Sequence, residues 1–457
     1  MCPDSSDHYQ ELSPSERYAA SRQRAEFAKT ELGKFSASLK FPMDPFQLEA
    51  AEQLEDGHAV LVAAPTGAGK TVVAEFAIHL ALSQGKKAFY TTPIKALSNQ
   101  KYTDLVAVYG QEKVGLLTGD TSRNPEAQIV VMTTEVLRNM LYADSNALEN
   151  LGYVVMDEVH YLADRFRGAV WEEVIIHLPE SVQLVALSAT VSNAEEFGAW
   201  LDTVRGSTSV IVSEHRPVPL WQHVMVGKEL YDLFMMTGDK ISTTQVNPEL
   251  VRLAARARRD IQPNDWGRPG SRGRNRQRTR NGRRQGDRRQ SDRRGSFEHS
   301  RAPRRDLRVS RPQMVRALSR EGLLPCITFI FSRNGCDAAV EQCLNAGLDL
   351  TTGTEKQQIL ETVDRAASVL VEQDRDALGF WGFRDGLRRG FAAHHAGLLP
   401  LFKEIVEELF AEGLIKVVFA TETLALGINM PARTVVIEKL VKFDGESHKD
   451  ITPGEYT

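Results

Sequence analysis

The chain has 457 residues, of which 42% are hydrophobic and 25% charged, and its 56 basic and 60 acidic side chains leave a formal net charge of −4. This length allows about three domains of roughly 150 residues each, and the apolar fraction suffices for globular cores, which excludes a small scaffold held together by disulfides. Four cysteines without a Cys-x-x-Cys pair favour a reducing compartment. No run of about 18 apolar residues occurs and the first residues are acidic and polar, so we expect a cytoplasmic protein without a membrane partner.

The predicted elements begin with a mixed-charge helix in residues 1–40, outside the first sheet, with a capped start at Ser13 and Glu16. Short apolar runs then alternate with helical stretches, which is typical of βαβ units around a parallel sheet. The runs expected to form strands are 59–63, 88–90, 128–132, 153–156 and 183–187, and later 326–331, 391–394, 416–420 and 434–437. The pattern predicts an α/β protein with two parallel-sheet domains joined by a charged connector.

One segment of that connector concentrates the basic charge. Between Arg268 and Arg308 there are sixteen arginines and four acids, a net charge of +12, so the remainder of the chain carries −16. The segment is rich in Gly, Asn, Gln and Ser and cannot bury enough apolar surface to offset its chain entropy, so we predict that it is disordered. We interpret it as an arm that neutralises phosphates of RNA or DNA, and a linker without a specific role is the alternative.

A glycine-rich turn follows the first predicted strand and precedes an apolar helical run. The residues of the turn are Ala64, Pro65, Thr66, Gly67, Ala68, Gly69, Lys70 and Thr71. Such a turn points several backbone N–H groups at one spot at the positive end of a helix dipole, where a polyphosphate can bind. Lys70 would reach the β- and γ-phosphates, and the Thr71 hydroxyl would bind Mg²⁺. An ordinary strand-to-helix turn is the alternative, and the strand before and the helix after the turn favour the phosphate site.

Two adjacent acids, Asp157 and Glu158, follow the strand predicted at 153–156. Open parallel sheets place their chemistry at the edge where the strands end. Asp157 would hold Mg²⁺ through water, and Glu158 would polarise the water that attacks the γ-phosphate. An acidic pair in this position is usually a solvated turn, but the upstream phosphate-binding turn favours the catalytic interpretation.

These motifs, together with Ser188-Ala189-Thr190, resemble the DExH-box branch of superfamily 2 helicases. The adjoining segments are most similar to the superkiller-type group of exosome-associated RNA helicases and to their actinobacterial HelY-like relatives. The resemblance is carried by segments 92–100, 117–120, 133–135, 157–162, 167–168, 171–173, 394–400 and 419–432. It implies two RecA-like parallel-sheet domains of the P-loop NTPase type in tandem, at 41–213 and 321–457. It also implies an N-terminal helical extension at 1–40 and a connector at 214–320 that holds the disordered insertion at about 260–310.

The resemblance also implies roles for single residues. Phe41 would stack on the adenine and Gln47 would hydrogen-bond to it, unless the two merely pack at a strand-to-helix entry. His160 would belong to the catalytic motif, Ser188 and Thr190 would couple the nucleotide to the interdomain cleft, and Gly427 and Asn429 would face the nucleotide from the second domain. The residues that would hold a nucleic-acid strand by its phosphates are Pro93, Lys95, Thr118, Gly119, Asp120, Thr134 and Glu135, and in the second domain Ser332, Arg333, His395, Gly397 and Thr421. A metal site at the paired histidines is disfavoured because no third ligand stands near them.

The family pattern continues beyond Tyr456 with two arginines that reach the γ-phosphate, so we expect this chain to have an incomplete second domain, to hydrolyse ATP weakly and not to unwind. The resemblance implies an ATP-dependent helicase that moves 3′-to-5′ on RNA, with ATP and Mg²⁺ as cofactors and single-stranded RNA or DNA as partner. A nuclease partner is left open. The alternatives are a DNA helicase of a repair pathway, since nothing in the sequence inspects the 2′-hydroxyl, and a non-catalytic nucleic-acid binding module gated by ATP.

Overall fold

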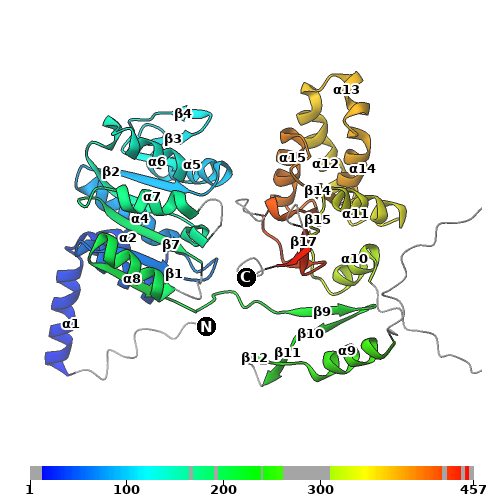
Figure 1. The fold of residues 1–457 in the computed structure, drawn as a ribbon, viewed down its shortest axis with the longest axis horizontal. Helices are drawn as coiled ribbons and strands as arrows, with labels where there is room; N and C mark the ends of the chain where they lie inside the picture. The colour runs from blue at the N-terminus through cyan, green and yellow to red at the C-terminus, as the bar shows by residue number, and fades with distance from the viewer. Residues whose placement is uncertain are drawn as a thin grey trace, which may run out of the picture.

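The computed structural model describes residues 13–163, 168–189, 194–237, 240–260, 309–424, 430–443 and 448–451. The arginine-rich insertion, Thr190, Gly427 and Asn429 lie outside the described residues. Two parallel sheets dominate the described part, each with helices packed against it, as Figure 1 shows. The prediction of an α/β fold with two parallel sheets is therefore confirmed.

The first sheet has eight strands in the order β4-β3-β5-β2-β6-β7-β1-β8, and only the β3–β4 pair at one edge is antiparallel. The strands are β1 (Ala59–Ala63), β2 (Lys87–Thr92), β3 (Val114–Thr118), β4 (Thr121–Arg123), β5 (Ile129–Thr133), β6 (Leu151–Met156), β7 (Gln183–Ser188) and β8 (Thr208–Val212). Every residue of β5 and β6 is buried, as expected for parallel strands that are covered on both faces.

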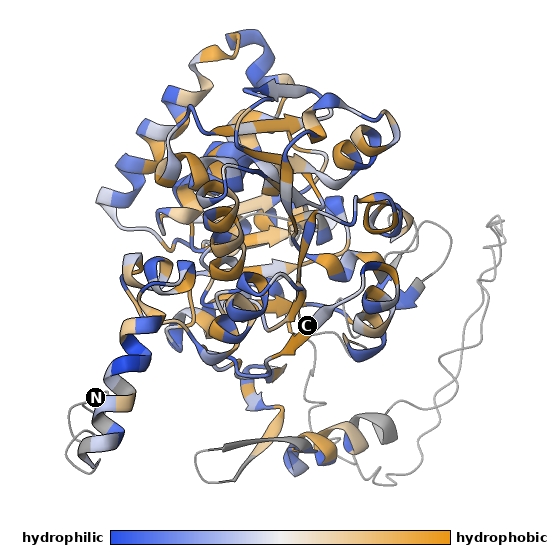
Figure 2. Cartoon of the chain, turned by 90° about the vertical axis from the view of Figure 1, so that its left-hand side faces the viewer, coloured by the Kyte–Doolittle hydropathy of each residue, from blue (hydrophilic) through white to orange (hydrophobic). Residues whose placement is uncertain are grey.

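Helices cover both faces of this sheet and form two separate cores. One core gathers residues from α3 (Pro45–Glu55), α4 (Thr71–Ser83) and α5 (Lys95–Tyr109). The other gathers residues from α6 (Thr134–Tyr142), α7 (Gly168–His177) and α8 (Ala194–Arg205). In Figure 2 the apolar residues gather on the strands and on the helix faces turned toward them, whereas the N-terminal helix is largely hydrophilic.

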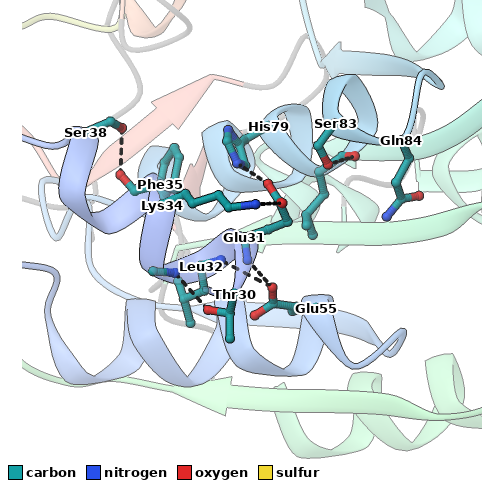
Figure 3. A network of polar contacts seen from close by, with 12 residues as sticks. Thr30, Glu31, Leu32, Lys34, Phe35, Ser38, Glu55, His79, Ser83 and Gln84 are labelled. Carbon is teal, nitrogen blue, oxygen red and sulfur yellow. Dashed lines mark hydrogen bonds and ion pairs between the residues drawn. The ribbon is translucent and has the colours of Figure 1, made fainter. Parts of the chain in front are cut away.

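The N-terminal segment forms two helices where the sequence predicted one. Ser13 caps α1 (Pro14–Phe27) in the predicted capping box with Glu16, and Thr30 then caps a second helix, α2 (Glu31–Ser38). Figure 3 shows how α2 is fastened to α3 and α4: an oxygen of Glu55 accepts the backbone N–H of Glu31 at 2.6 Å, and the Glu31 side chain lies 3.0 Å from His79. Because α3 and α4 begin at the predicted nucleotide site, α2 braces the far ends of both helices.

The second sheet has four parallel strands in the order β14-β15-β13-β16. Its strands are β13 (Cys326–Phe329), β14 (Phe391–His394), β15 (Val417–Ala420) and β16 (Thr434–Ile437), and the short strands β17 (Val441–Phe443) and β18 (His448–Asp450) pair separately. The helices around it are α10 (Arg311–Arg320), α11 (Arg333–Asn345), α12 (Gly353–Ala366), α13 (Glu372–Ala377), α14 (Phe380–Arg388) and α15 (Pro400–Ala411). All four sheet strands coincide with predicted ones to within two residues.

Between the two sheets, residues 213–222 run without helix or strand into two hairpins that the sequence analysis did not predict. The hairpins are β9 (His223–Val226) with β10 (Glu229–Asp232) and β11 (Phe234–Thr237) with β12 (Lys240–Val246), and helix α9 (Pro248–Asp260) follows them. Met225 of β9 packs against the core of the second sheet, so this hairpin belongs spatially with the second half of the chain (Figure 1). No described helix is both long and apolar enough to cross a membrane.

Candidate nucleotide site

The glycine-rich turn sits between β1 and α4, where the sequence predicted it. Gly67 and Gly69 both have φ = +84°, a left-handed conformation that disfavours any side chain. A Cβ on Gly69 would also lie 2.7 Å from Nε2 of Gln47. Helix α4 begins at Thr71, so the turn delivers the chain directly to the positive end of a helix dipole. These features are what a phosphate-binding loop requires.

Gln47 makes a contact that the sequence analysis did not foresee. It is buried at the start of α3, its Oε1 accepts the backbone N–H of Asp44 at 2.9 Å, and its Nε2 donates to the carbonyl oxygens of Gly69 at 3.0 Å and Ala68 at 3.3 Å. The amide therefore ties α3 to the phosphate loop. Phe41 is 53% exposed.

The loop, the acidic pair and Ser188 meet at one edge of the first sheet. Strand β7 lies between β1 and β6, and its last residue, Ser188, accepts the Ala64 N–H at 3.2 Å. On the other side of β7 the acids follow directly after β6. The Ser188 hydroxyl is buried and has no hydrogen-bond partner in the part of the chain that the structure describes. The Ser188 carbonyl thus contacts the start of the phosphate loop, while Thr190 lies outside the described residues.

Tyr90 positions the first acid and was missed by the sequence analysis. Its hydroxyl is fully buried and donates to Oδ2 of Asp157 at 2.6 Å, while Oδ1 accepts the backbone N–H of Glu158 at 2.9 Å. Burial and the neighbouring Asp157 charge raise the pKa of Tyr90 well above its usual value, which keeps the hydroxyl protonated as a donor. Glu158 adopts φ = +54°, a strained conformation for a residue with a side chain.

Charges at this edge are partly buried and perturb one another. Burial lowers the pKa of Lys70, whose ammonium donates to the Ala64 carbonyl at 2.7 Å and the Pro65 carbonyl at 3.2 Å. Burial and Asp157 together raise the pKa of Glu158 to about 7, against the opposing effect of Lys70. His160, on the 3₁₀ helix Val159–Ala163, has its Nδ1 3.2 Å from Oε2 of Glu158, and burial followed by the Lys70 charge lowers its pKa. A carboxyl that titrates near neutrality suits a general base.

These residues fit a magnesium nucleotide. Lys70 satisfies its hydrogen bonds with carbonyls of its own loop, which a phosphate could replace, and the loop N–H groups supply further donors. Each oxygen of Asp157 keeps a free lone pair besides its one partner, enough to hold a hydrated Mg²⁺ together with the Thr71 hydroxyl. Within the described ranges no three His, Cys, Asp or Glu side chains cluster as a metal site.

The residues predicted to hold nucleic acid in the first half do come together at the same edge. Lys95, at the start of α5, has its Nζ 2.6 Å from Oδ2 of Asp120, and the Thr118 hydroxyl donates to Oδ1 of Asp120 at 3.0 Å. Pro93 and Gly119 lie in the turns beside them, and Glu135 lies in the first turn of α6. Thr134 differs from expectation, because it is fully buried and its hydroxyl donates to the Thr92 carbonyl at 3.3 Å. Its side chain is therefore not accessible to a nucleic-acid strand in this structure.

The corresponding edge of the second sheet gathers the other predicted contacts. Ser332 caps α11 by accepting the Gly335 N–H, the next residue, Arg333, is exposed, and the Thr421 N–H donates to the His394 carbonyl. His395 also differs from expectation: it is buried, its Nε2 lies 3.0 Å from Asp337, and its Nδ1 accepts the Gly397 N–H at 3.1 Å. Its side chain shapes the turn that presents Gly397 and has no free nitrogen for a ligand.

The fold and this site define a P-loop nucleotide-binding protein, with a phosphate loop after β1 and an acidic pair after β6 of a parallel sheet. Residues 44–197 match the family model described as DEAD/DEAH box helicase, and this part of the chain is a RecA-like domain. It is 58% identical over 427 residues to the Probable helicase HelY of Mycobacterium leprae (strain TN), a match that covers 93% of the chain and 44% of that protein.

More distant relatives are eukaryotic helicases. The chain is 42% identical to the DExH-box ATP-dependent RNA helicase DExH11 of Arabidopsis thaliana, over 91% of the chain and 31% of that protein. It is 39% identical to the Antiviral helicase SKI2 of Saccharomyces cerevisiae, over 92% of the chain and 34% of that protein. The chain therefore spans less than half the length of these relatives, and the predicted resemblance to superkiller-type and HelY-like helicases is confirmed.

Proposed function

We propose that this protein is an ATP-dependent helicase that couples hydrolysis of Mg·ATP to movement along single-stranded RNA. The observation that carries the proposal is the meeting of Lys70, Asp157 and Glu158 at one sheet edge, with the pKa of Glu158 raised to about 7. The proposed units are an ATP-binding domain at 41–213, preceded by the helical extension at 1–40, a connector at 214–320 and a second domain at 321–457.

In this proposal the chain's own groups divide the work of hydrolysis. Lys70 leaves the loop carbonyls and binds the β- and γ-phosphates, Phe41 stacks on the adenine, and Gly427 and Asn429 contribute from the second domain. Asp157 is held by Tyr90 to receive the metal's water, and Thr71 supplies a hydroxyl. When bound, Mg²⁺ offsets the negative charge that develops on the phosphates. Glu158 in its ionised form accepts the proton of the attacking water, with His160 beside it.

The nucleic-acid strand is proposed to lie across the two sheet edges. Lys95, which Asp120 positions on the first edge, and Arg333 with the turn at Gly397 on the second edge contact the phosphates of the strand. Movement in the 3′-to-5′ direction follows from opening and closing of the two halves. The arginine-rich insertion adds salt-dependent affinity for the strand.

RNA is favoured over DNA because a relative is named as an RNA helicase. Superkiller complex protein 2 of mouse, 41% identical over 91% of this chain and 31% of that protein, suggests a protein partner as well, of which a nuclease is one candidate.

The experiment that tests the proposal is an ATPase titration of the full-length protein with single-stranded RNA and single-stranded DNA. Stimulation by RNA that is lost in both Lys70→Ala and Glu158→Gln supports it. Stimulation by DNA alone would replace it by a DNA helicase, and stimulation by neither polymer would leave a nucleic-acid binding module gated by ATP.

A further inference from the structure

The chain leaves the first sheet beside the phosphate loop. Strand β8 runs parallel to β1 on the side away from β7, in a register that pairs Ala63 with Val212. The next residue, Ser213, donates its N–H to the Ala63 carbonyl at 2.9 Å, one residue before the loop begins. Arg216 follows three residues later, within about 10 Å of backbone from this anchor, so its long side chain can reach the loop.

Arg216 is sheltered in a segment that is otherwise open to solvent. The neighbours on either side are exposed, including Val218 at 77% and Leu220 at 57%, whereas Arg216 itself is only partly exposed. Within the described ranges the structure records no hydrogen bond and no ion pair for its guanidinium. A partly buried arginine without a partner carries a desolvation cost that nothing in the described part of the chain offsets.

The charge of Arg216 acts on the lysine of the phosphate loop. Burial lowers the pKa of Lys70 most, and the charge of Arg216 lowers it further, while Glu158 and Asp157 act in the opposite direction. The two cations therefore lie close enough to repel each other, next to a loop whose backbone N–H groups also point toward negative charge. An arrangement of two cations and several donors becomes favourable when an anion with several oxygens binds between them.

We propose that Arg216 is a phosphate ligand of the bound nucleotide, supplied to the first sheet's site by the connector. A guanidinium presents a planar fork of donors that matches two phosphate oxygens, and Lys70 provides a point charge beside it. The assignment deepens the proposed function, on which it rests, by adding a nucleoside di- or triphosphate contact outside the loop and the acidic pair.

The position of Arg216 gives the contact a consequence for the second half of the chain. Seven residues after Arg216 the chain enters β9, and Met225 of that strand packs on the core of the second sheet. A nucleotide held by Arg216 thus fixes one end of the described segment that leads from the first sheet to the hairpin packed on the second. Release of the phosphate frees that end, so the connector responds to the state of the nucleotide.

The test is equilibrium binding of Mg·ATP, Mg·ADP and AMP to the 457-residue chain, measured by isothermal titration calorimetry. Arg216→Gln is expected to weaken Mg·ATP binding about tenfold and AMP binding hardly at all, and Arg216→Lys to recover part of the loss. The matched control is Arg252→Gln on α9, an exposed arginine of the same connector, which is expected to bind like the wild type. A third variant, Lys70→Ala, tests separately whether the phosphate loop binds Mg·ATP.

Thermal unfolding without nucleotide distinguishes a ligand from a structural residue. Removing one of two repelling cations should leave the Tm of Arg216→Gln unchanged or slightly raised, while the Tm increase caused by Mg·ATP shrinks. A lowered Tm without nucleotide, wild-type affinity for Mg·ATP, or an equal loss in Arg252→Gln would each overturn the proposal. If Lys70→Ala loses binding and Arg216→Gln does not, the inference alone fails. If the wild type binds no Mg·ATP, the proposed function fails with it.

Discussion

The two sheet edges use their polar residues differently. At the first edge Tyr90 is buried, Lys70 and Glu158 are partly buried, and all three have shifted pKa values. Among the described residues, Lys70 has loop carbonyls as its hydrogen-bond partners. At the second edge the buried histidines each have a carboxylate partner, Glu407 at 2.8 Å for His394 and Asp337 at 3.0 Å for His395. The first edge holds charges that an incoming ligand can still satisfy, whereas both histidines of the second edge already have a carboxylate partner.

The two parallel sheets are similar in fold, but their edges suit different kinds of site. Buried charges that disturb each other cost stability and provide reactivity, as chemistry on phosphates requires. Buried polar groups that already have partners hold turns rigidly, and rigid turns with exposed Arg333 and Gly397 suit a surface that grips a strand without reacting with it. We therefore infer that reactivity is confined to the first edge.

The largest effect is expected from Lys70→Ala. The lysine contributes a buried charge-assisted contact to the phosphates, so its removal should weaken Mg·ATP binding about 100-fold or more. Isothermal titration calorimetry measures this change. If Lys70→Ala bound Mg·ATP as tightly as the wild type, the nucleotide would bind elsewhere, and the first edge would not be the site of phosphate chemistry.

The next effect concerns the second edge. Truncating His395 leaves a buried space and removes the acceptor of the Gly397 N–H, so His395→Ala should lower the free energy of unfolding by about 2 kcal/mol. Chemical denaturation measures the loss, with the exposed His177→Ala as a matched control. The affinity for Mg·ATP should stay within about twofold of wild type, and a larger change would show that the second edge shares the nucleotide chemistry.

Glu158→Gln tests the first edge through the pH dependence of the free energy of unfolding. The pKa of Glu158 in the folded chain, about 7, exceeds its usual value of 4.5, so the folded state binds this proton more tightly than the unfolded state. The contribution of this proton to the free energy of unfolding is fully present below pH 4.5 and is lost as the pH rises through 7. The neutral glutamine avoids that loss, so relative to wild type the variant should gain about 1–2 kcal/mol between pH 5 and pH 8. Denaturation at both pH values measures the gain, and a pH-independent difference would contradict it.

The smallest effect is expected from Tyr90→Phe. The change removes one donor from Asp157 and leaves the packing of the ring, so the Mg²⁺ dependence of ATP binding should weaken by a few-fold, about 1 kcal/mol. Titration of Mg²⁺ at fixed ATP measures it. A matched Tyr153→Phe, which loses a bond to Gln84 away from the acids, should leave the Mg²⁺ dependence unchanged. An equal effect of the two variants would mean that Tyr90 does not position the acid.

Local sequence patterns predicted most of the fold and the centre of the site. The strand before the glycine-rich turn and the strand before Asp157 are continuous apolar runs. The turn itself needs Gly67 and Gly69 for its positive φ values. Each of these patterns is contained in a few neighbouring residues, so the sequence alone reveals it. Nothing local, by contrast, predicted the β3–β4 pair, whose second strand has only three largely exposed residues, or the hairpins of the connector.

The remaining differences arise from contacts between residues far apart in the chain. Tyr90 meets Asp157, 67 positions away, only because β2 and β6 are neighbours in the sheet. Gln47 contacts the Gly69 carbonyl 22 positions later, and the burial of Thr134 and His395 depends on which face of a turn packs inward. The sequence predicted one helix in residues 1–40 because no glycine or proline marks the break before Thr30. The break is instead caused by the Thr30 cap and by the packing of α2 on α3 and α4.

Hydrogen–deuterium exchange of the 457-residue chain with and without Mg·ATP tests most directly whether the nucleotide binds at the edge of the first sheet. We predict slower exchange in residues 64–71, 157–160 and 213–216, with smaller changes in 332–333 and 395–397. Protection concentrated in the second sheet, or in the connector hairpins, with none in residues 64–71, would contradict the claim.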